Sequence, residues 1–519
     1  MGTEWRSLGT NYSVIYLYNN LMNKFLILAL LDLSGLAHGQ HQHHEGMQMP
    51  ADTVKKINVA KPMDHSMHQG MGADNHDGMS DGAMVNYGFT MDTTMGMTHS
   101  LSRNLPMNRN GSGTAWHPDN TPMYAYMRTP SGSKWSYMLH YAVYLRYTSQ
   151  NVNNADKRGH AQQFGAPNWV MGMAQRNVGR RGLFQVRAML SLDPLTVTNG
   201  GYPLLFQTGE SYKGQPLVDK QHPHDLVSEL SVSYSHAFSK DIDLYGYVGY
   251  PGEPALGPPA FMHRISAFGI PEAPLGHHWQ DATHILFGVA TAGFRYKWAK
   301  LEASSFTGRE PNEDRYNFDK PRFDSYSYRL SVNPSASMAL QFSQGFIHSP
   351  EDLHPEENVT RTTASVLHSK GLGPDRYVTS AVVWGRNSHD GEGENSFLAE
   401  SSLQWDRIAF YGRYENVSKS PEELNINFVD PIPELNGRHG FIINSLTLGT
   451  NYRIAQMRNT DLVLGTQVTV SIPDRTLILQ TLYGKMPVSG EVYMRISPSL
   501  MTMRSMNHSG HGRMKGTRH

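Results

Sequence analysis

The stretch from Trp135 to Tyr147 limits most strongly what this chain can fold into. Alternate positions are aromatic or aliphatic on one side and mixed polar on the other. Successive side chains of a β-strand point to opposite faces, so this stretch predicts a strand with one apolar face. Its apolar face begins and ends on an aromatic residue, as expected at the two interfaces of a membrane. We therefore predict a transmembrane β-strand over 135–147.

The same alternation recurs in seven pairs of segments further along the chain. Each pair is joined by a few residues rich in Gly, Pro, Asn, Asp or Ser, the residue types of tight hairpin turns. The last strand is expected at Glu491–Pro498. The expected pairs are 169–177 with 183–192, 230–238 with 242–250, 284–296 with 300–307, 325–332 with 338–347, 361–369 with 376–385, 396–404 with 407–416, and 441–454 with 461–471.

Long connections separate these hairpins, at 148–167, 193–226, 251–283, 308–324, 348–360, 386–394, 417–440 and 472–489. Short turns that alternate with long loops are typical of outer-membrane barrels, whose short turns face the periplasm. The pattern predicts an all-β fold, a transmembrane antiparallel β-barrel of about 16 strands. An even strand number requires that the apolar segment Thr476–Tyr483 belong to a loop. A soluble β-sandwich or propeller is the alternative for the alternation alone.

Composition excludes several classes of protein. The chain has 45 basic and 45 acidic residues and no cysteine. A formal net charge of zero argues against nucleic-acid binding, and the absence of cysteine excludes disulfides and thiolate metal sites. Histidine, methionine and carboxylates remain as metal ligands. No metalloprotease, nucleophile-elbow or phosphate-loop motif occurs, so no organic cofactor is predicted and the chain is not expected to be an enzyme.

The first 39 residues are predicted to be a signal peptide. Asn23-Lys24 precedes the apolar run Phe25–Leu31, and small residues follow before Gly39. A basic flank, a short apolar core and small residues before a cleavage site are typical of secretory signals. Met22 is the expected true start. The alternative is a buried helix. Export followed by barrel formation predicts an outer-membrane location.

Residues 40–115 are predicted to form a disordered arm that binds metal ions, ahead of a barrel over 116–498. The arm has few aliphatic residues to bury. Thioether sulfur favours Cu(I) or Ag(I), whereas imidazole suits Cu(II), zinc and nickel. The tail 499–519 is again rich in Met and His. A solvated linker is the alternative for the arm. Its candidate ligands are Met63, His65, Met67, His68, Met71, His76 and Met79.

A second set of candidate metal ligands lies in the two long loops that flank one hairpin, 227–250. Because these loops leave neighbouring strands, we expect their histidines on one side of the barrel mouth, with Asp225 or Asp281 orienting an imidazole. The Pro-rich segment 251–259 is expected to be packed and to favour inward folding of its loop. Histidines that only hydrogen-bond within the loops are the alternative. The candidates are His222, His224, Asp225, His263, His277, His278 and His284.

Two resemblances bear on function. The Met-Asp-His-Ser-Met-His segment at 63–68, placed before a barrel, resembles the layout of the copper-resistance protein B class. The segments Lys220–Asp225 and Pro274–Asp281 are similar to an uncharacterised bacterial family of predicted outer-membrane proteins. This second resemblance implies a companion of heavy-metal efflux systems.

Together these observations predict an outer-membrane barrel that binds, sequesters or passes copper or silver ions as part of heavy-metal resistance. Its partners would be outer-membrane lipid, metal ions and a heavy-metal efflux system, with no nucleic acid. Two other classes stay open. One is a barrel enzyme with a hydrolytic site in the outer loops, which requires a Ser–His pair. The other is a soluble periplasmic metal-binding β protein, which would not depend on detergent.

Overall fold

The computed structural model describes residues 99–197, 200–389, 391–426, 435 and 440–501. Contacts divide the chain into two units, Met1–Ser80 and Asp81–His519, and all described residues belong to the second. The predicted signal peptide, the candidate ligands of the arm and the tail beyond Met501 lie outside the described residues. Within the described part, no helix is long and apolar enough to cross a membrane.

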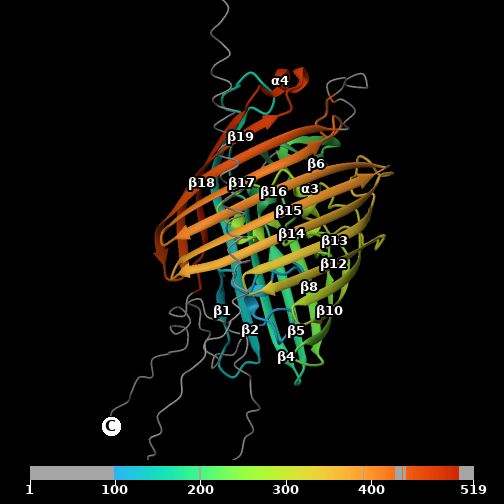
Figure 1. Ribbon diagram of the computed structural model, residues 1–519, viewed down its shortest axis with the longest axis vertical. Coiled ribbons are helices and arrows are strands. Elements are labelled where there is room, and N and C mark those ends of the chain that lie inside the picture. Colours follow the sequence, from blue (N-terminus) through green and yellow to red (C-terminus); the bar gives the residue numbers. More distant parts are fainter. Residues whose placement is uncertain (1–98, 198–199, 390, 427–434, 436–439, 502–519) are drawn as a thin grey trace, which may run out of the picture. The chain divides into compact units, whose positions relative to one another are not determined.

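Sixteen antiparallel strands form one closed barrel (Figure 1). Each strand pairs with the next along the chain, and the last closes the ring by pairing with the first, with Val143 opposite Ile496. This confirms the predicted fold class. The barrel strands are β2 (Trp135–Gln150), β4 (Asn168–Val178), β5 (Gly182–Leu190), β8 (Val227–Ala237), β9 (Ile242–Gly249), β10 (Val289–Tyr296), β11 (Ala299–Phe306), β12 (Ser325–Ser335), β13 (Met338–His348), β14 (Asn358–Gly373), β15 (Arg376–His389), β16 (Glu392–Trp405), β17 (Ile408–Lys419), β18 (Phe441–Met457), β19 (Thr460–Pro473) and β20 (Val488–Pro498).

Short elements occupy the connections. The apolar segment Thr476–Tyr483, which an even strand number places in a loop, is helical from Leu477 onward. Thr476 caps this helix by accepting a hydrogen bond of 3.3 Å from the backbone N–H of Leu479. This confirms the assignment of that segment to a loop. The short elements are η1 (Met107–Arg109), β1 (Tyr126–Arg128), β3 (Ala161–Gly165), α2 (Asp193–Thr196), β6 (Tyr202–Tyr212), β7 (Gln215–Gln221), η2 (Phe261–His263), η3 (Ile265–Ala267), α3 (His277–Gln280), η4 (Ala282–His284) and α4 (Leu477–Tyr483).

The barrel wall has an apolar outer face and a polar inner face, as expected of a barrel surrounded by lipid. On β12, Tyr326 and Leu330 point outward and are 60% and 45% exposed, whereas Arg329 points inward and is fully buried. A soluble sandwich or propeller would place the apolar side chains inside. An apolar outer face around a closed ring of hydrogen-bonded strands is the arrangement that satisfies the backbone in a bilayer. The chain therefore has the architecture of a transmembrane barrel.

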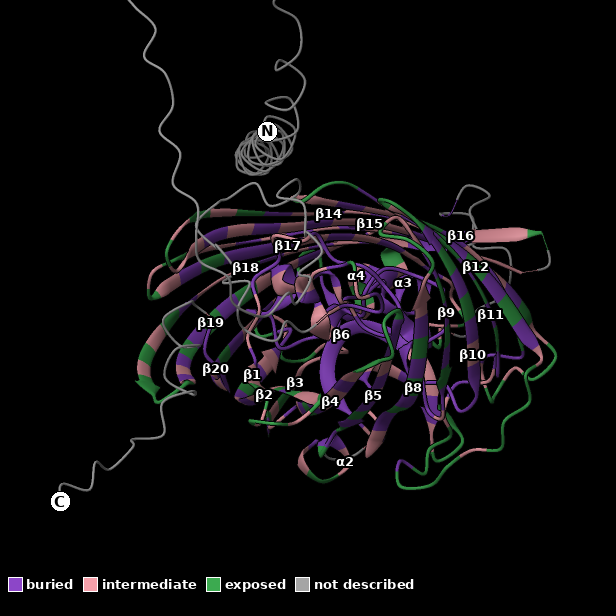
Figure 2. Cartoon of the chain, turned by 90° about the horizontal axis from the view of Figure 1, so that it is seen from below, coloured by how far each residue is buried: buried purple, intermediate pink, exposed green. Residues whose placement is uncertain are grey.

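Besides the buried strand β6, two segments lie inside the ring of strands. The first is residues 250–288 between β9 and β10, here called the inner loop, which is buried along almost its whole length. Its α3 lies inside the ring in Figure 2. Arg264 ties the loop to the wall, since its guanidinium lies 2.9 Å from Glu400 of β16 and 2.8 Å from Asp281. The expected packing of 251–259 and inward folding of this loop are confirmed.

The second segment is residues 99–125, here called the N-terminal segment. Its Trp116 is buried, and the ammonium group of Lys300 lies 4.7 Å from the centre of that ring. Arg329 donates a hydrogen bond of 2.7 Å to the hydroxyl of Thr114. The predicted boundary between arm and barrel, after residue 115, is therefore too late. The segment has no strand periodicity, and it is held by wall side chains that sequence alone does not place beside it.

Three further predictions about connections need correction. His284 does not open a strand, because it belongs to η4 and β10 begins at Val289. The expected long loop at 386–394 is a tight turn, since His389 of β15 pairs with Glu392 of β16. The polar residues of this segment predicted a loop. Strand ends that extend beyond the membrane, however, can pair with each other without an apolar face. The loop 193–226 contains a hairpin, β6–β7, that was not expected.

Candidate metal centre

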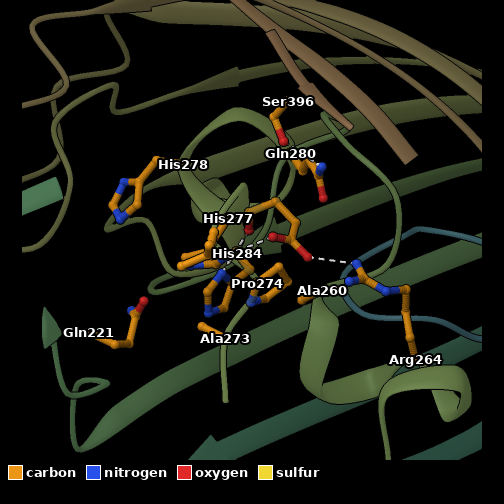
Figure 3. Close-up of polar contacts among 12 residues, drawn as sticks. Gln221, Ala260, Arg264, Ala273, Pro274, His277, His278, Gln280, His284 and Ser396 are labelled. Atoms are coloured by element: carbon orange, nitrogen blue, oxygen red, sulfur yellow. Dashed lines mark hydrogen bonds and ion pairs between the residues drawn. The ribbon is translucent and has the colours of Figure 1, made fainter. Parts of the chain in front are cut away.

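The two long loops on either side of the β8–β9 hairpin bring five histidines together inside the barrel. His222 and His224 follow β7, His277 and His278 form the first turn of α3, and His284 ends η4. We call these five residues the lumen histidine group. Figure 3 shows His277 and His284 close together in the inner loop, with His278 on one side of them and Arg264 on the other.

Distances between ring centres show how closely the group is packed. The ring of His277 lies 5.1 Å from that of His284 and 5.4 Å from that of His278. His222 lies 5.6 Å from His278, and His224 lies 5.5 Å from His284. The convergence expected from the topology therefore holds for these five histidines. Their role as metal ligands stays a prediction.

His263 lies elsewhere, contrary to the expected grouping. Its ring is 5.7 Å from that of His140 on β2 and 4.9 Å from Trp169 on β4. The reason is the direction of η2, whose Phe261 lies 5.3 Å from His277 while His263 lies against the wall. Phe261 and His263, two residues apart on η2, therefore contact different parts of the barrel interior.

Oxygen acceptors fix three of the imidazoles through their Nδ1 atoms. His277 contacts Asp281 at 2.6 Å, and His224 contacts Asp193 at 2.8 Å. His284 contacts the backbone carbonyl of Asp281 at 2.8 Å. Such contacts leave Nε2 as the atom available to a metal ion, as is usual for metal-binding histidines. The expected orienting role of Asp281 is present.

Asp225 does not orient an imidazole. Its carboxylate lies 3.4 Å from the guanidinium of Arg315, which also pairs with Glu210. Asp193 has the role that was expected of Asp225. Sequence reasoning missed Asp193 because it stands 31 residues before its histidine, at the start of α2, and only the folding of the loop joins them.

Several ring nitrogens in the group are buried and have no hydrogen-bond partner. They are the Nε2 atoms of His224, His278 and His284. Leaving a buried polar atom without a partner costs about 1–3 kcal/mol. Such atoms are rare in native structures, and a role in binding an ion is one recognised reason for them.

Burial keeps most of these imidazoles neutral. It lowers the pKa of His284 to about 3 and lowers the pKa values of His222 and His277 as well. His278 differs: burial acts to lower its pKa, but the carboxylates of Glu310 and Glu210 raise it above the ordinary value. Metal ions bind neutral imidazole, so His277 and His284 are ready as ligands at neutral pH.

The group is not arranged as a finished metal site. Among the described residues, no three His, Asp or Glu side chains are placed so that they could hold one ion. The bonded nitrogens of His224, His277 and His284 contact carboxylate or carbonyl oxygens and not a serine hydroxyl. The group therefore lacks the Ser–His pair that the hydrolytic alternative requires.

Comparison with known proteins finds only distant similarities. No protein-family model matches the sequence, and no curated protein matches it. Solved structures of barrels are similar. Salmonella typhi OmpF in complex with daunomycin has 9% identity and a TM-score of 0.44 over 72% of this chain and 100% of that chain. An anion-selective porin from Comamonas acidovorans has 10% identity and a TM-score of 0.41 over 70% of this chain and 99% of that chain. Pseudomonas aeruginosa OccK3 has 10% identity and a TM-score of 0.34 over 70% of this chain and 96% of that chain. Likenesses this distant carry no argument about fold or function. The layout of an outer-membrane barrel rests on the chain's own closed ring of strands and its apolar outer face.

Proposed function

We propose that this chain is a non-enzymatic outer-membrane barrel that binds copper or silver ions and sequesters or passes them as part of heavy-metal resistance. The observation that carries the proposal is the pair of orphaned Nε2 atoms on His224 and His284. Both atoms are buried, both rings are held through Nδ1, and the ring centres are 5.5 Å apart.

The chemistry of these donors supports a soft or borderline metal ion. Imidazole nitrogen suits Cu(II), and Cu(I) also accepts it beside thioether ligands. A ring centre separation of 5.5 Å leaves room for one ion between two imidazoles after a modest rotation of either ring. His277, at 5.1 Å from His284, is the third ligand within reach. Binding one ion would satisfy both orphaned nitrogens.

The arm has its own part in this proposal, outside the described residues. Because the sequence predicts a disordered arm, its thioethers would collect Cu(I) or Ag(I) at modest affinity per site, each ion ordering the stretch of chain that binds it. Replacing Met63, Met67, Met71 and Met79 by Leu in the full-length protein is expected to lower the number of Ag(I) ions bound per chain. An unchanged number would exclude thioethers as the ligands of the arm.

The test of the lumen site is a double substitution, His224→Gln with His284→Gln. Purified full-length protein is incubated with Cu(II), passed through a desalting column in detergent and analysed for copper per chain. We expect the double variant to lose one copper ion per chain relative to the unmodified protein. The matched control is His236→Gln on β8, because His236 lies beside Phe238 and Tyr234 away from the group.

Equal copper in the double variant and the unmodified protein would leave only a structural role for these histidines. Sequestration and passage are separated with the same proteins in vesicles loaded with a copper-sensitive dye. A dye response that depends on His224 and His284 indicates passage, and retained copper without a response indicates sequestration.

A further inference from the structure

One part of the inner wall is lined by methionine. On the inward faces of three neighbouring strands, β2, β4 and β5, lie Met138, Met171, Met173 and Met189, all of them buried. Met138 is directly opposite Met173, and Met171 is directly opposite Met189. Directly opposite residues of an antiparallel pair have Cβ atoms about 4.5–5.5 Å apart. The four thioethers therefore form one patch.

The segments inside the barrel add methionines to the same patch. Met107 of the N-terminal segment is buried there, and Met123, Met127, Met262 and Met501 pack against it. We call these residues, with the four on the wall, the methionine cluster. Of the thirteen methionines in the described part of the chain, nine belong to this cluster.

Apolar packing alone does not account for this choice of residue. The largest other apolar cluster inside the barrel is built from leucine, valine, isoleucine and aromatic side chains, among them Leu204, Leu275 and Val417. The cluster around Leu256 and Leu286 has the same composition. Within the described residues, neither of these two clusters contains a methionine. These two clusters hold the inner segments against the wall without methionine. Packing inside this barrel therefore does not require thioether side chains.

Two imidazoles complete the cluster. His140 lies opposite Met171 in the β2–β4 register, and its ring is 5.7 Å from that of His263. Both rings lie against Trp169, at 5.1 Å and 4.9 Å. The Nε2 atom of His140 is buried and has no hydrogen-bond partner. A buried imidazole nitrogen without a hydrogen-bond partner therefore belongs to the residue directly opposite Met171, one of the four wall methionines.

We propose that the methionine cluster, with His140 and His263, is a binding site for a soft monovalent metal ion, Cu(I) or Ag(I). Thioether sulfur is a soft, uncharged ligand that selects Cu(I) over hard divalent ions. Arg187, a cation opposite Met173 in the β4–β5 register, donates a hydrogen bond of 2.6 Å to the carbonyl oxygen of Gly113. Its guanidinium also lies 3.9 Å from the carboxylate of Glu229. The site shares the class of metal with the proposed function, but it shares no ligand with the lumen histidine group.

The position of the site suits a transfer between the two groups. Phe261 contacts the rings of His224, His277 and His284, and the next two residues, Met262 and His263, belong to the methionine cluster. The short helix η2 thus touches both groups of ligands.

The test uses full-length protein in detergent and Ag(I) as the probe, in chloride-free buffer. The variant is the double substitution Met171→Leu with Met173→Leu, and bound silver is counted per chain by mass spectrometry after desalting. We expect the loss of one Ag(I) per chain. The matched control is Met457→Leu with Met494→Leu, which changes two methionines outside the cluster and should lose none. Methionine and leucine have similar volumes, so both variants should fold, at a cost below about 1.5 kcal/mol.

A second measurement keeps the test decisive if the double variant is unstable. In unmodified protein labelled with carbon-13 at its methionine methyl groups, Ag(I) should shift the resonances of Met171 and Met173, assigned through the single variants. The resonance of Met494 should stay in place. Resonances of Met171 and Met173 that do not move, or an unchanged silver count in the double variant, would overturn the proposal.

The outcome is separable from that of the proposed lumen histidine site. His224→Gln with His284→Gln should keep the silver ion that depends on Met171 and Met173. If the histidine variant loses no copper while the methionine variant loses silver, the histidine site fails and the methionine site stands. Zinc binding should be the same in both methionine variants and in unmodified protein, since zinc sites in proteins take Cys, His, Asp or Glu as ligands and not methionine.

Discussion

At the scale of single residues, the inner loop contains one carboxyl group, that of Glu253, whose surroundings favour its neutral form. Burial raises the pKa of Glu253 from its ordinary value of 4.5 to about 8. The stability that a group with a raised pKa contributes is complete below its unfolded pKa and is lost as the pH rises through its folded pKa. For Glu253 this window runs from pH 4.5 to about pH 8.

We expect Glu253→Gln, which is neutral at every pH, to gain melting temperature relative to the unmodified protein as the pH rises through this window. Melting in detergent at several pH values measures the difference. The control is Glu313→Gln: slight burial acts to raise the pKa of Glu313, but hydrogen bonds from the backbone N–H groups of Gly214 and Lys213 lower it. Because the pKa of Glu313 is lowered, its variant should lose stability relative to the unmodified protein only as the pH rises to 4.5, and the difference should stay constant through the window of Glu253. A difference for Glu253 that does not vary with pH would contradict the assignment.

At the scale of elements, small residues let the inner loop approach the wall. Gly385 of β15 faces α3, and a Cβ atom there would lie 2.2 Å from the carbonyl oxygen of Trp279. No real Cβ atom tolerates such a contact, and the obstacle is backbone that cannot rotate away. Glycine at this position therefore places α3, and with it His277 and His278, against the barrel wall.

We expect Gly385→Val to displace α3 and to destabilise the protein by about 1–3 kcal/mol, as overpacking usually does. Urea unfolding in detergent micelles measures the loss. Gly172→Val on β4 is the matched control, because a Cβ atom there meets nothing within 4 Å. Equal stability of the two variants would mean that α3 does not pack against β15. Copper binding by the lumen histidine group should weaken in Gly385→Val only.

At the scale of the whole molecule, the outer face of the barrel wall must match a lipid bilayer. Val468, near the middle of β19, is 50% exposed, and Met457, at the turn end of β18, is 62% exposed. In water the two exposed positions would tolerate lysine equally well. In a bilayer the cost depends on depth.

We therefore expect Val468→Lys to cost about 2–4 kcal/mol of folding free energy in lipid vesicles, and Met457→Lys only about 0–1 kcal/mol. Urea titration of folding into vesicles, followed by tryptophan fluorescence, measures both. If the two variants lose the same amount, this face of the barrel does not lie in the bilayer.

The sequence by itself determined the barrel. Side-chain alternation and turn residues are local properties, so the wall strands between Trp135 and Pro498 follow from short stretches of chain. The loop at Thr476–Tyr483 followed instead from the even strand number of the barrel, and its helical form was not predicted. Long-loop histidines were also predictable as a group, because the loops that carry them leave one hairpin. The misassigned loop at 386–394 shows the limit of this reasoning, since polar strand ends and loops have the same composition.

Only the tertiary structure decided what fills the barrel and which ligands meet. The N-terminal segment has no periodicity, and its place depends on wall residues such as Lys300 and Arg329. Asp193 reaches His224 across a folded loop. The thioethers of β2, β4 and β5 become one patch only through strand register, with Met138 opposite Met173. Contacts between residues far apart in sequence depend on how the whole ring closes, and no local pattern encodes that.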